Sequence, residues 1–406
     1  MDELKEWLRQ RTDEQIQMLQ QLVQVPSDNP PGDCIAHALR ATELLEQLGF
    51  EVEQHSVPEE VCKQHGLPRV MNLVVRHRFG PGPTIALNAH GDVVPPGGGW
   101  SKDPYGGVVE DGWLYGRGAA VSKSDFVTYA YALKALIETR ALAAGCVELH
   151  FTYDEESGGF TGPAWLLSEE ITQPDYAVCA AFSYHVITAH NGCLHLDVTV
   201  EGRSAHAAWH QTGVDAIEAT VPMLSALYRH RETLEERVSH YPGVSCPSLV
   251  IGTIEGGINT NVVPDRVSFS IDRRIIPEES PEQVEQELRA LIASVASQAG
   301  VRLSITQRLL AKPFISTPAS EQLADFFAKA AQQVVGEPVG TAAMPLYTDA
   351  RHYSEAGVPT IMYGAGPRDP LDANGHRADE RVPVHLLTDA ALVIASGINE
   401  LFSNHK

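Results

Sequence analysis

The chain has 406 residues, of which 43% are hydrophobic and 20% are charged, and its formal net charge is −22. These values predict two or three ordered domains, and the negative charge disfavours nucleic acids and anionic membranes as partners. No apolar run reaches the roughly 18 residues of a membrane helix, and the acidic N-terminus does not resemble a signal peptide. We therefore expect a cytoplasmic protein whose six scattered cysteines are reduced thiols.

The first part of the chain predicts an α/β domain, because helical and strand-like segments alternate along it. The expected helices cover 14–24, 36–48, 122–136 and 163–167, and the expected strands cover 70–75, 84–88, 147–153 and 176–179. The strand segments are nearly continuous apolar runs, which is typical of a buried, largely parallel sheet.

The middle of the chain predicts a smaller domain of another kind. Leu194–Glu201 alternates apolar and polar residues with period two, as a strand with one solvated face does. Further elements are expected as a helix at 213–238, strands at 248–255 and 262–272, a helix at 281–296 and a strand at 301–307. This β-α-β-β-α-β order is the ferredoxin-like arrangement.

After Leu310 the α/β pattern returns, with a strand expected near 359–362 and a final helix at 386–402. We therefore predict a mixed, largely parallel α/β domain formed by 1–193 and 308–406, with a ferredoxin-like domain inserted at 194–307.

His90 and Asp92 follow a predicted strand in the segment NAHGD. Loops at the carboxyl ends of parallel strands are where open α/β sheets place their sites. The aspartate can accept a hydrogen bond from one imidazole nitrogen, which leaves the other nitrogen for a metal ion. Taken alone, a His-x-Asp loop is also compatible with a structural role.

Asp154, Glu155 and Glu156 form a second acidic group, at the end of the strand VELHFTY and before a glycine turn. Adjacent carboxylates repel one another unless a cation or a shared proton reduces the repulsion between their charges. Two neighbouring glutamates can divide the work, one binding a metal and the other accepting a proton from water. A solvated acidic turn is the plain alternative, and His376, in the polar loop NGHRADE, means little alone.

The motifs are specific as a set, although each one alone is not. NAHGD, GRGxxxxK, DEESGG, GRSAHAA, GGINTNVVPD, YTDAR and GHRADE occur in this order along nearly the whole chain. The sequence resembles the metallopeptidase and deacylase family of acetylornithine deacetylase, which also holds succinyl-diaminopimelate desuccinylase, the zinc glutamate carboxypeptidases and aminoacylase. In that family the larger domain binds two zinc ions bridged by an aspartate, and the insert forms the dimer and acts as a lid.

The resemblance implies roles for five residues of the larger domain. His90 would bind one metal, with Asp92 behind it, and Glu155 would be the general base that activates water. Glu156 and His376 would bind the other metal.

For the insert, the resemblance implies that His206 steadies the oxyanion, often in the site of the partner subunit. Asn261 and Arg274 match positions that hold the carboxylate or carbonyl of the substrate, a task that suits an amide and a bidentate guanidinium. Two plain alternatives remain open, since Asn261 could only shape a turn and Arg274 could pair with a nearby acid.

Two carboxylates of the family pattern are absent. Val121 stands at the place of the bridging aspartate, and Ala180 stands where a glutamate or aspartate is expected. Both carboxylates would bind the same metal as His90, so losing both together removes the ligands of one metal position and leaves the other intact. His90, Glu156 and His376 remain, and two histidines with one glutamate form a known catalytic zinc set.

Three hypotheses follow. In the first, the protein is a mononuclear hydrolase in which His90 reaches a single ion. In the second, His185 or Asp125 replaces a missing metal ligand, and in the third, the protein is an inactive relative with a binding or regulatory role. Asp125 is also explained as an acidic residue in the first turn of a helix. We expect a homodimeric amidohydrolase that acts on a small N-acyl amino acid or dipeptide with a free carboxylate. We expect one zinc per chain rather than two, with manganese or cobalt as alternatives.

Overall fold

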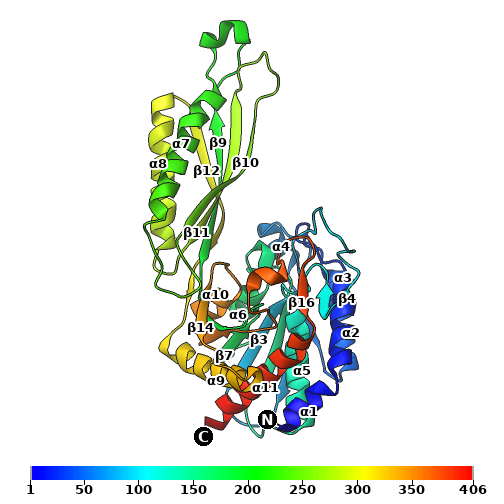
Figure 1. Cartoon of the computed structure of the whole chain (residues 1–406). Coiled ribbons are helices and arrows are strands. Elements are labelled where there is room, and N and C mark those ends of the chain that lie inside the picture. The colour runs from blue at the N-terminus through cyan, green and yellow to red at the C-terminus, as the bar shows by residue number, and fades with distance from the viewer. Residues whose placement is uncertain (1, 405–406) are drawn as a thin grey trace. The chain divides into compact units, whose positions relative to one another are not determined.

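The computed structural model describes residues 2–404 and divides them into two compact units (Figure 1). The larger unit contains the described residues up to Thr188, Ser316–Ala342 and those from Thr348 onward. The smaller unit, called the insert below, contains Ala189–Ile315 and Ala343–Tyr347. It is wider than the expected 194–307 because its first strand begins at Gly192 and its last strand continues to Ala311.

The main sheet has the order β1-β2-β6-β3-β7-β15-β8-β13, and β14 pairs with β8. The strands are β1 (Glu53–Ser56), β2 (Met71–Arg78), β3 (Thr84–His90), β6 (Cys146–Thr152), β7 (Tyr176–Cys179), β8 (Val186–His190), β13 (Phe314–Ile315), β14 (Thr341–Met344) and β15 (Thr360–Met362). The central strands β6, β3, β7 and β15 pair in parallel, whereas β1, β2, β8 and β13 make antiparallel pairs. The predicted mixed, largely parallel sheet is confirmed.

Helices cover this sheet because each has an apolar face to bury. They are α1 (Asp2–Arg9), α2 (Thr12–Val23), α3 (Ile35–Gln47), α4 (Glu59–Gln64), α5 (Lys123–Glu138), α6 (Pro163–Ser168), α9 (Pro318–Val335), α10 (Ala350–Glu355) and α11 (His385–Asn404). Phe126 of α5 stacks on Phe151 of β6, with 3.9 Å between ring centroids. This contact anchors α5, and with it the loop that precedes α5, on the sheet.

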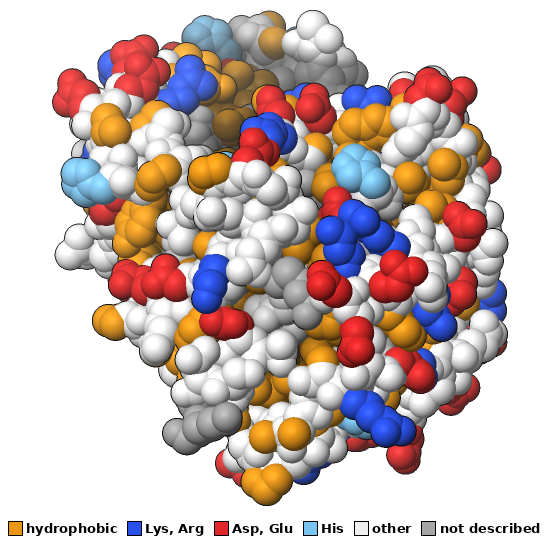
Figure 2. Space-filling model, turned by 60° about the horizontal axis from the view of Figure 1, so that its bottom comes forward, with side chains coloured by type: hydrophobic (Ala, Val, Ile, Leu, Met, Phe, Trp, Pro, Cys, Tyr) orange, Lys and Arg blue, Asp and Glu red, His pale blue; other side chains and the backbone are white. Residues whose placement is uncertain are grey.

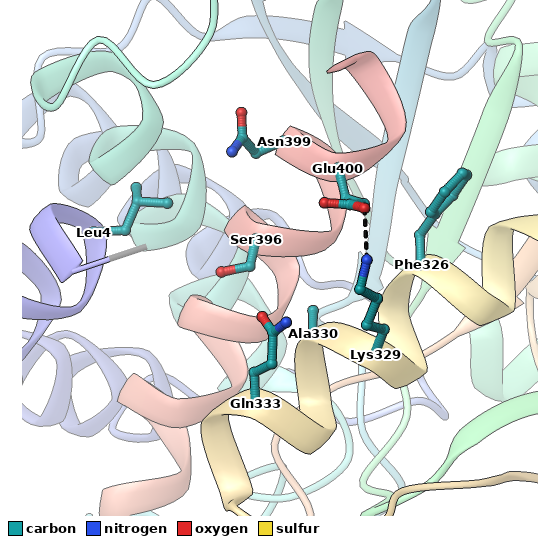
Figure 3. A pocket seen from close by; sticks show the side chains of 8 residues that line it. All are labelled: Leu4, Phe326, Lys329, Ala330, Gln333, Ser396, Asn399 and Glu400. Carbon is teal, nitrogen blue, oxygen red and sulfur yellow. Dashed lines mark hydrogen bonds and ion pairs between the residues drawn. The ribbon is translucent and has the colours of Figure 1, made fainter. Parts of the chain in front are cut away.

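The helix α11 is long and apolar enough by composition to cross a membrane, but most of it is buried in the core, where it packs against α5 and α9. Where α9 and α11 meet near α1, a pocket of about 160 Å³ lies beside Leu4, and Lys329 Nζ is 2.9 Å from a Glu400 carboxylate oxygen (Figure 3). The helix α9 is not among the elements expected from the sequence.

The insert is a ferredoxin-like domain. Its elements are β9 (Gly192–Glu201), α7 (Ala216–Leu234), β10 (Ser248–Gly256), β11 (Arg266–Ile275), α8 (Pro281–Ala299) and β12 (Arg302–Ala311), as expected from the sequence pattern. The sheet order is β10-β11-β9-β12, and every pair is antiparallel. Alternate residues of β9, beginning with Leu194, are buried in the core that the insert's helices share, so the residues between them line the other face of the sheet.

A three-stranded sheet, β16 (Arg381–Pro383), β5 (Trp113–Tyr115) and β4 (Val108–Glu110), completes the larger unit. It brings the GRG motif after β5 beside the GHRADE motif before β16. On the face of the molecule that Figure 2 shows, acidic side chains lie among basic ones, with apolar side chains scattered between them.

Candidate active site

Two acidic motifs meet at one edge of the main sheet. β3 and β6 are parallel, and His90 at the end of β3 lies opposite Thr152 at the end of β6. The loops that follow the two strands therefore leave the sheet side by side. Asp92 lies in one loop, and Glu155 and Glu156 lie in the short 3-10 helix of the other.

His90 is almost fully buried and its two ring nitrogens face different groups. Nδ1 lies 2.9 Å from the main-chain oxygen of Asp92 and 3.4 Å from its carboxylate oxygen Oδ1. Nε2 points the other way and lies 3.9 Å from Oε2 of Glu155. The nearest acceptor for the ring is thus the carbonyl of Asp92 rather than its carboxylate, but the result is the one expected: Nε2 faces the other acids.

Asp92 is fully buried and ties the two loops together. Its Oδ1 accepts a hydrogen bond from the backbone N–H of Glu155 at 3.2 Å, and its Oδ2 accepts one from that of Glu156 at 3.1 Å. Oδ2 also accepts from Nδ2 of Asn29 at 2.9 Å. Asp92 is therefore a positioning residue for both glutamates, and Asn29 is a partner that the sequence analysis missed.

His90, Glu155 and Glu156 each offer one ligand atom, and these atoms lie within 4.8 Å of one another. Nε2 of His376 lies 3.1 Å from Oε1 of Glu156, although half of the His376 side chain is exposed. His376 thus reaches the group through Glu156, at its rim. The structure thus brings His90 and Glu156 together with Glu155, whereas His376 contacts Glu156 only, so the set of His90, Glu156 and His376 stays a prediction.

Burial raises the pKa of Glu155 to about 8, and the charges of Glu156 and Asp92 act in the same direction. Burial alone would lower the pKa of His90, but the carboxylates of Glu155 and Asp92 raise it well above its usual value. These opposite groups create an environment in which a proton or a cation is strongly held.

Asp154 is the member of the acidic run that does not join this group. Its Oδ2 accepts a hydrogen bond from the hydroxyl of Thr161 at 2.7 Å, so it fixes the turn after β6. A second buried acid, Asp349, lies beside Glu155 instead, and burial followed by the charge of Glu155 raises the pKa of Asp349. The motif YTDAR was the signal that could have singled out Asp349.

Val121 lies in an apolar contact at the place where the bridging carboxylate was expected. A Cβ atom on Gly375 would lie 3.3 Å from Cγ2 of Val121 and 3.6 Å from Cζ of Phe182, so both side chains border Gly375, next to His376. Ala180 also packs against the hydrophobic core. Neither Val121 nor Ala180 offers an atom that can bind a metal.

The two candidate replacement ligands make other contacts. Asp125 is fully buried and its Oδ1 accepts hydrogen bonds from the N–H of Ala365 at 3.0 Å and the hydroxyl of Thr128 at 3.1 Å. The ring of His185 packs edge to face on Tyr184 at 5.2 Å. Within residues 2–404 neither belongs to a group of three ligand atoms within 4.8 Å. The hypothesis that they restore a metal pair gains no support.

In the insert, His206 and Asn261 are neighbours. The N–H of Ala207 donates to the carbonyl of Asn261 at 3.0 Å, and Nδ1 of His206 accepts from the N–H of Ala208 at 3.1 Å. Both are exposed. The guanidinium of Arg274 pairs with both carboxylate oxygens of Asp272, at 2.9 and 3.1 Å.

Comparison with known proteins identifies the family. The model of peptidase family M20/M25/M40 matches residues 86–400, which is most of the chain. The chain belongs to this M20 peptidase family. It is a hydrolase of amide bonds, and the suspected resemblance is confirmed.

Individual relatives match most of the length of the chain. A succinyl-diaminopimelate desuccinylase of Leptothrix cholodnii is 28% identical over 369 residues, covering 88% of this chain and 91% of the relative. Human carnosine dipeptidase 1 has the same fold, with a TM-score of 0.78, 18% identity and coverage of 99% of this chain and 98% of that one. A Bacillus subtilis structure described as a dinuclear metal-binding M20 peptidase has a TM-score of 0.69, 14% identity and coverage of 97% and 99%.

M20 metallopeptidases depend on metal ions, so the donor set decides what this chain can hold. One imidazole and two carboxylates gathered within 4.8 Å, with a second imidazole beside them, fit a single zinc-class ion. At the two positions where further carboxylates were expected, the side chains of Val121 and Ala180 offer no oxygen atom to a second ion.

Proposed function

We propose that the protein is a cytoplasmic, zinc-dependent amidohydrolase that cleaves the amide bond of a small N-acyl amino acid or dipeptide. The observation that carries the proposal is the placement of Glu155 Oε2 at 3.9 Å from His90 Nε2, with Glu156 alongside. This placement supports the proposal, because one carboxylate can act as a base beside groups that can bind a metal, at the carboxyl edge of a parallel sheet.

His90, Glu156 and His376 would hold a single zinc ion, with manganese or cobalt as substitutes. When bound, such an ion polarises a carbonyl oxygen and makes water more acidic. Glu155 accepts the proton of the attacking water and later delivers it to the leaving amine. Asp92 keeps Glu155 in place through its backbone N–H, and burial excludes competing water.

The insert supplies the groups for the substrate in this proposal. The exposed His206 steadies the oxyanion, while Asn261 and Arg274 hold the free carboxylate or the carbonyl of the substrate. Arg274 has to exchange its bond with Asp272 for the substrate, so carboxylate binding competes with an existing ion pair.

A homodimer through the insert is part of the proposal. β10 is an edge strand of the insert sheet. Val250 and Ile254 on β10 and Val221 on α7 expose more than half of their surface, and a groove of about 260 Å³ lies between these elements. Unpaired edge strands and exposed apolar side chains are suited to pairing with a second copy.

The test is a screen of N-acyl amino acids and dipeptides with added Zn²⁺, Mn²⁺ or Co²⁺. We expect turnover of at least one small carboxylate-bearing amide, and a loss of about 10²–10⁴-fold in kcat for Glu155→Gln with metal binding retained. Glu138→Gln makes the same charge change at an exposed glutamate of α5, outside the site, so it is the matched control.

A binding or regulatory role is the second candidate, and the observation that favours it is the apolar contact at Val121. The second role is correct, and the hydrolase proposal fails, if at least one of the screened N-acyl amino acids or dipeptides binds tightly but none of them is hydrolysed with any of the three metals.

A further inference from the structure

A second group of metal-binding side chains lies on the insert sheet, on the face opposite to its helices. Cys193 and His195 are two residues apart on β9, and Asp272 and Arg274 are two residues apart on β11. The register places Asp272 opposite His195, and Arg274 opposite Cys193. Because side chains alternate between the faces of a strand, all four project from one face. Leu194, between the two β9 residues, is buried in the insert core.

The distances within this group suit a metal ion. Nε2 of His195 lies 3.1 Å from Oδ2 of Asp272, and Sγ of Cys193 lies 3.9 Å from Oδ1 of Asp272. One ligand atom from each of the three lies within 4.8 Å of the others. Tetrahedral zinc, with bonds of about 2.0–2.3 Å, separates its ligand atoms by about 3.3–3.7 Å. Small side-chain movements therefore suffice to surround an ion.

We propose that Cys193, His195 and Asp272 bind one divalent cation of the zinc class. A thiolate and an imidazole favour Zn²⁺, Co²⁺ or Cd²⁺, whereas Mg²⁺ and Ca²⁺ prefer oxygen ligands only. The side chains of His195 and Asp272 are 23% and 29% exposed, which gives an ion access from solvent, while Cys193 is buried beneath them. Three protein ligands leave the fourth position of the ion open.

Arg274 shares Asp272 with this cation. At present its Nε and Nη2 atoms bind both oxygens of the carboxylate. A carboxylate has about four lone-pair sites, so one oxygen can bind the cation while the other keeps a single bond from Arg274. Cation binding thus replaces a two-point ion pair by a one-point contact. The guanidinium, which also lies 5.8 Å from the ring centroid of Tyr347, becomes freer to meet an anion.

A cobalt titration of the metal-free full chain tests the proposal. Thiolate bound to Co²⁺ gives a sulfur-to-metal charge-transfer absorption, and the donor group of the larger unit contains no thiol. We expect this absorption in the wild-type protein and in Cys246→Ser, which removes the cysteine that is not fully buried. It should vanish in Cys193→Ser.

His195→Gln alters a partly exposed side chain and is the second variant, which keeps the test decisive if Cys193→Ser does not fold. We expect it to keep the fold, as judged by circular dichroism, and to raise the Kd for Co²⁺ at this site at least about tenfold. The proposal is overturned if the wild-type protein shows no charge-transfer absorption, or if the absorption persists in Cys193→Ser. An unchanged Kd in His195→Gln overturns it as well. Because the readout is a thiolate spectrum, failure here leaves the proposed hydrolysis untouched.

Discussion

The side chain of Glu380 binds the backbone of Val121: Oε1 of the Glu380 carboxylate accepts a hydrogen bond from the N–H of Val121 at 3.1 Å. The same oxygen accepts from the N–H of Ala120 at 3.1 Å, and the other oxygen pairs with the buried guanidinium of Arg117. The loop after the GRG motif is therefore shaped by backbone contacts. These two bonds use backbone N–H groups and not the side chain of Val121, so they can also form with another side chain at position 121.

We expect Glu380→Gln to lower the free energy of unfolding by about 3–5 kcal/mol, because it leaves the Arg117 charge buried without its counter-charge. Urea unfolding followed by circular dichroism measures the change. The matched control is Glu43→Gln, which breaks an exposed pair with Arg40 and should cost less than about 1 kcal/mol. Equal effects of the two substitutions would show that the buried pair does not hold the loop.

We expect at most one tightly bound metal per chain in the larger unit, because a close metal pair needs a bridging carboxylate and Val121 cannot supply it. Elemental analysis of protein prepared without chelator should give a ratio near one or below. The measurement belongs in the Cys193→Ser background, so that an ion in the insert is not counted.

The paired variant Val121→Asp with Ala180→Glu should raise this ratio towards two, whereas either single change should do little. The variant Val121→Asn with Ala180→Gln introduces similar volume without charge and is the control. A ratio of two in the Cys193→Ser protein with Val121 intact would contradict the mononuclear site. It would bring Asp125 and His185 back as ligands after a rearrangement.

We expect the protein to sediment as a dimer at micromolar concentration and Ile254→Lys to sediment as a monomer, because the new charge lies on the exposed edge strand β10. If His206 acts in the site of the partner subunit, the monomer loses activity as well. Leu39→Lys changes a similarly exposed apolar residue of α3 in the larger unit and should leave the dimer intact. A wild-type protein that sediments only as a monomer rules out the trans role.

We expect Asp125→Asn to flatten the pH dependence of stability. Burial raises the pKa of Asp125 from its ordinary value of 3.8 to about 8. The folded state then keeps a proton that the unfolded state releases, so stability falls as pH rises between about 4 and 8, by up to about 1.4 kcal/mol per pH unit. Urea unfolding of wild type and variant across this range measures the difference. Parallel curves would mean that Asp125 is ionised in the folded protein.

Much of the fold could be predicted because its signals are local. The run Tyr176–Cys179 is apolar throughout and forms β7 with the expected bounds, and the period-two pattern of Leu194–Glu201 lies within β9. The missed helix α9 also had local signals, since Thr317 caps its start, Pro318 is its first residue and Gly336 ends it.

The site was less predictable, because its partners come from distant segments. His90 and Glu155 were predicted as site residues from motifs at strand ends, whereas Asn29 lies in no motif and Glu380 stands out only as the last residue of GHRADE. Each is a polar residue in a loop, and only the folded chain shows which oxygen or N–H it meets. Phe182 could not be predicted as the neighbour of Gly375 for the same reason.

β15 lies between β7 and β8 in the main sheet, although the chain delivers it only after the insert and α9. Roughly 180 residues separate the end of β7 from the start of β15, so a ribosome adding about 5–20 residues per second needs about 10–40 s to supply the missing strand. All four strands of the insert emerge within that interval. On the growing chain the insert can thus fold first, while the edge of β7 stays unpaired and exposed to chaperones or to a neighbouring nascent chain.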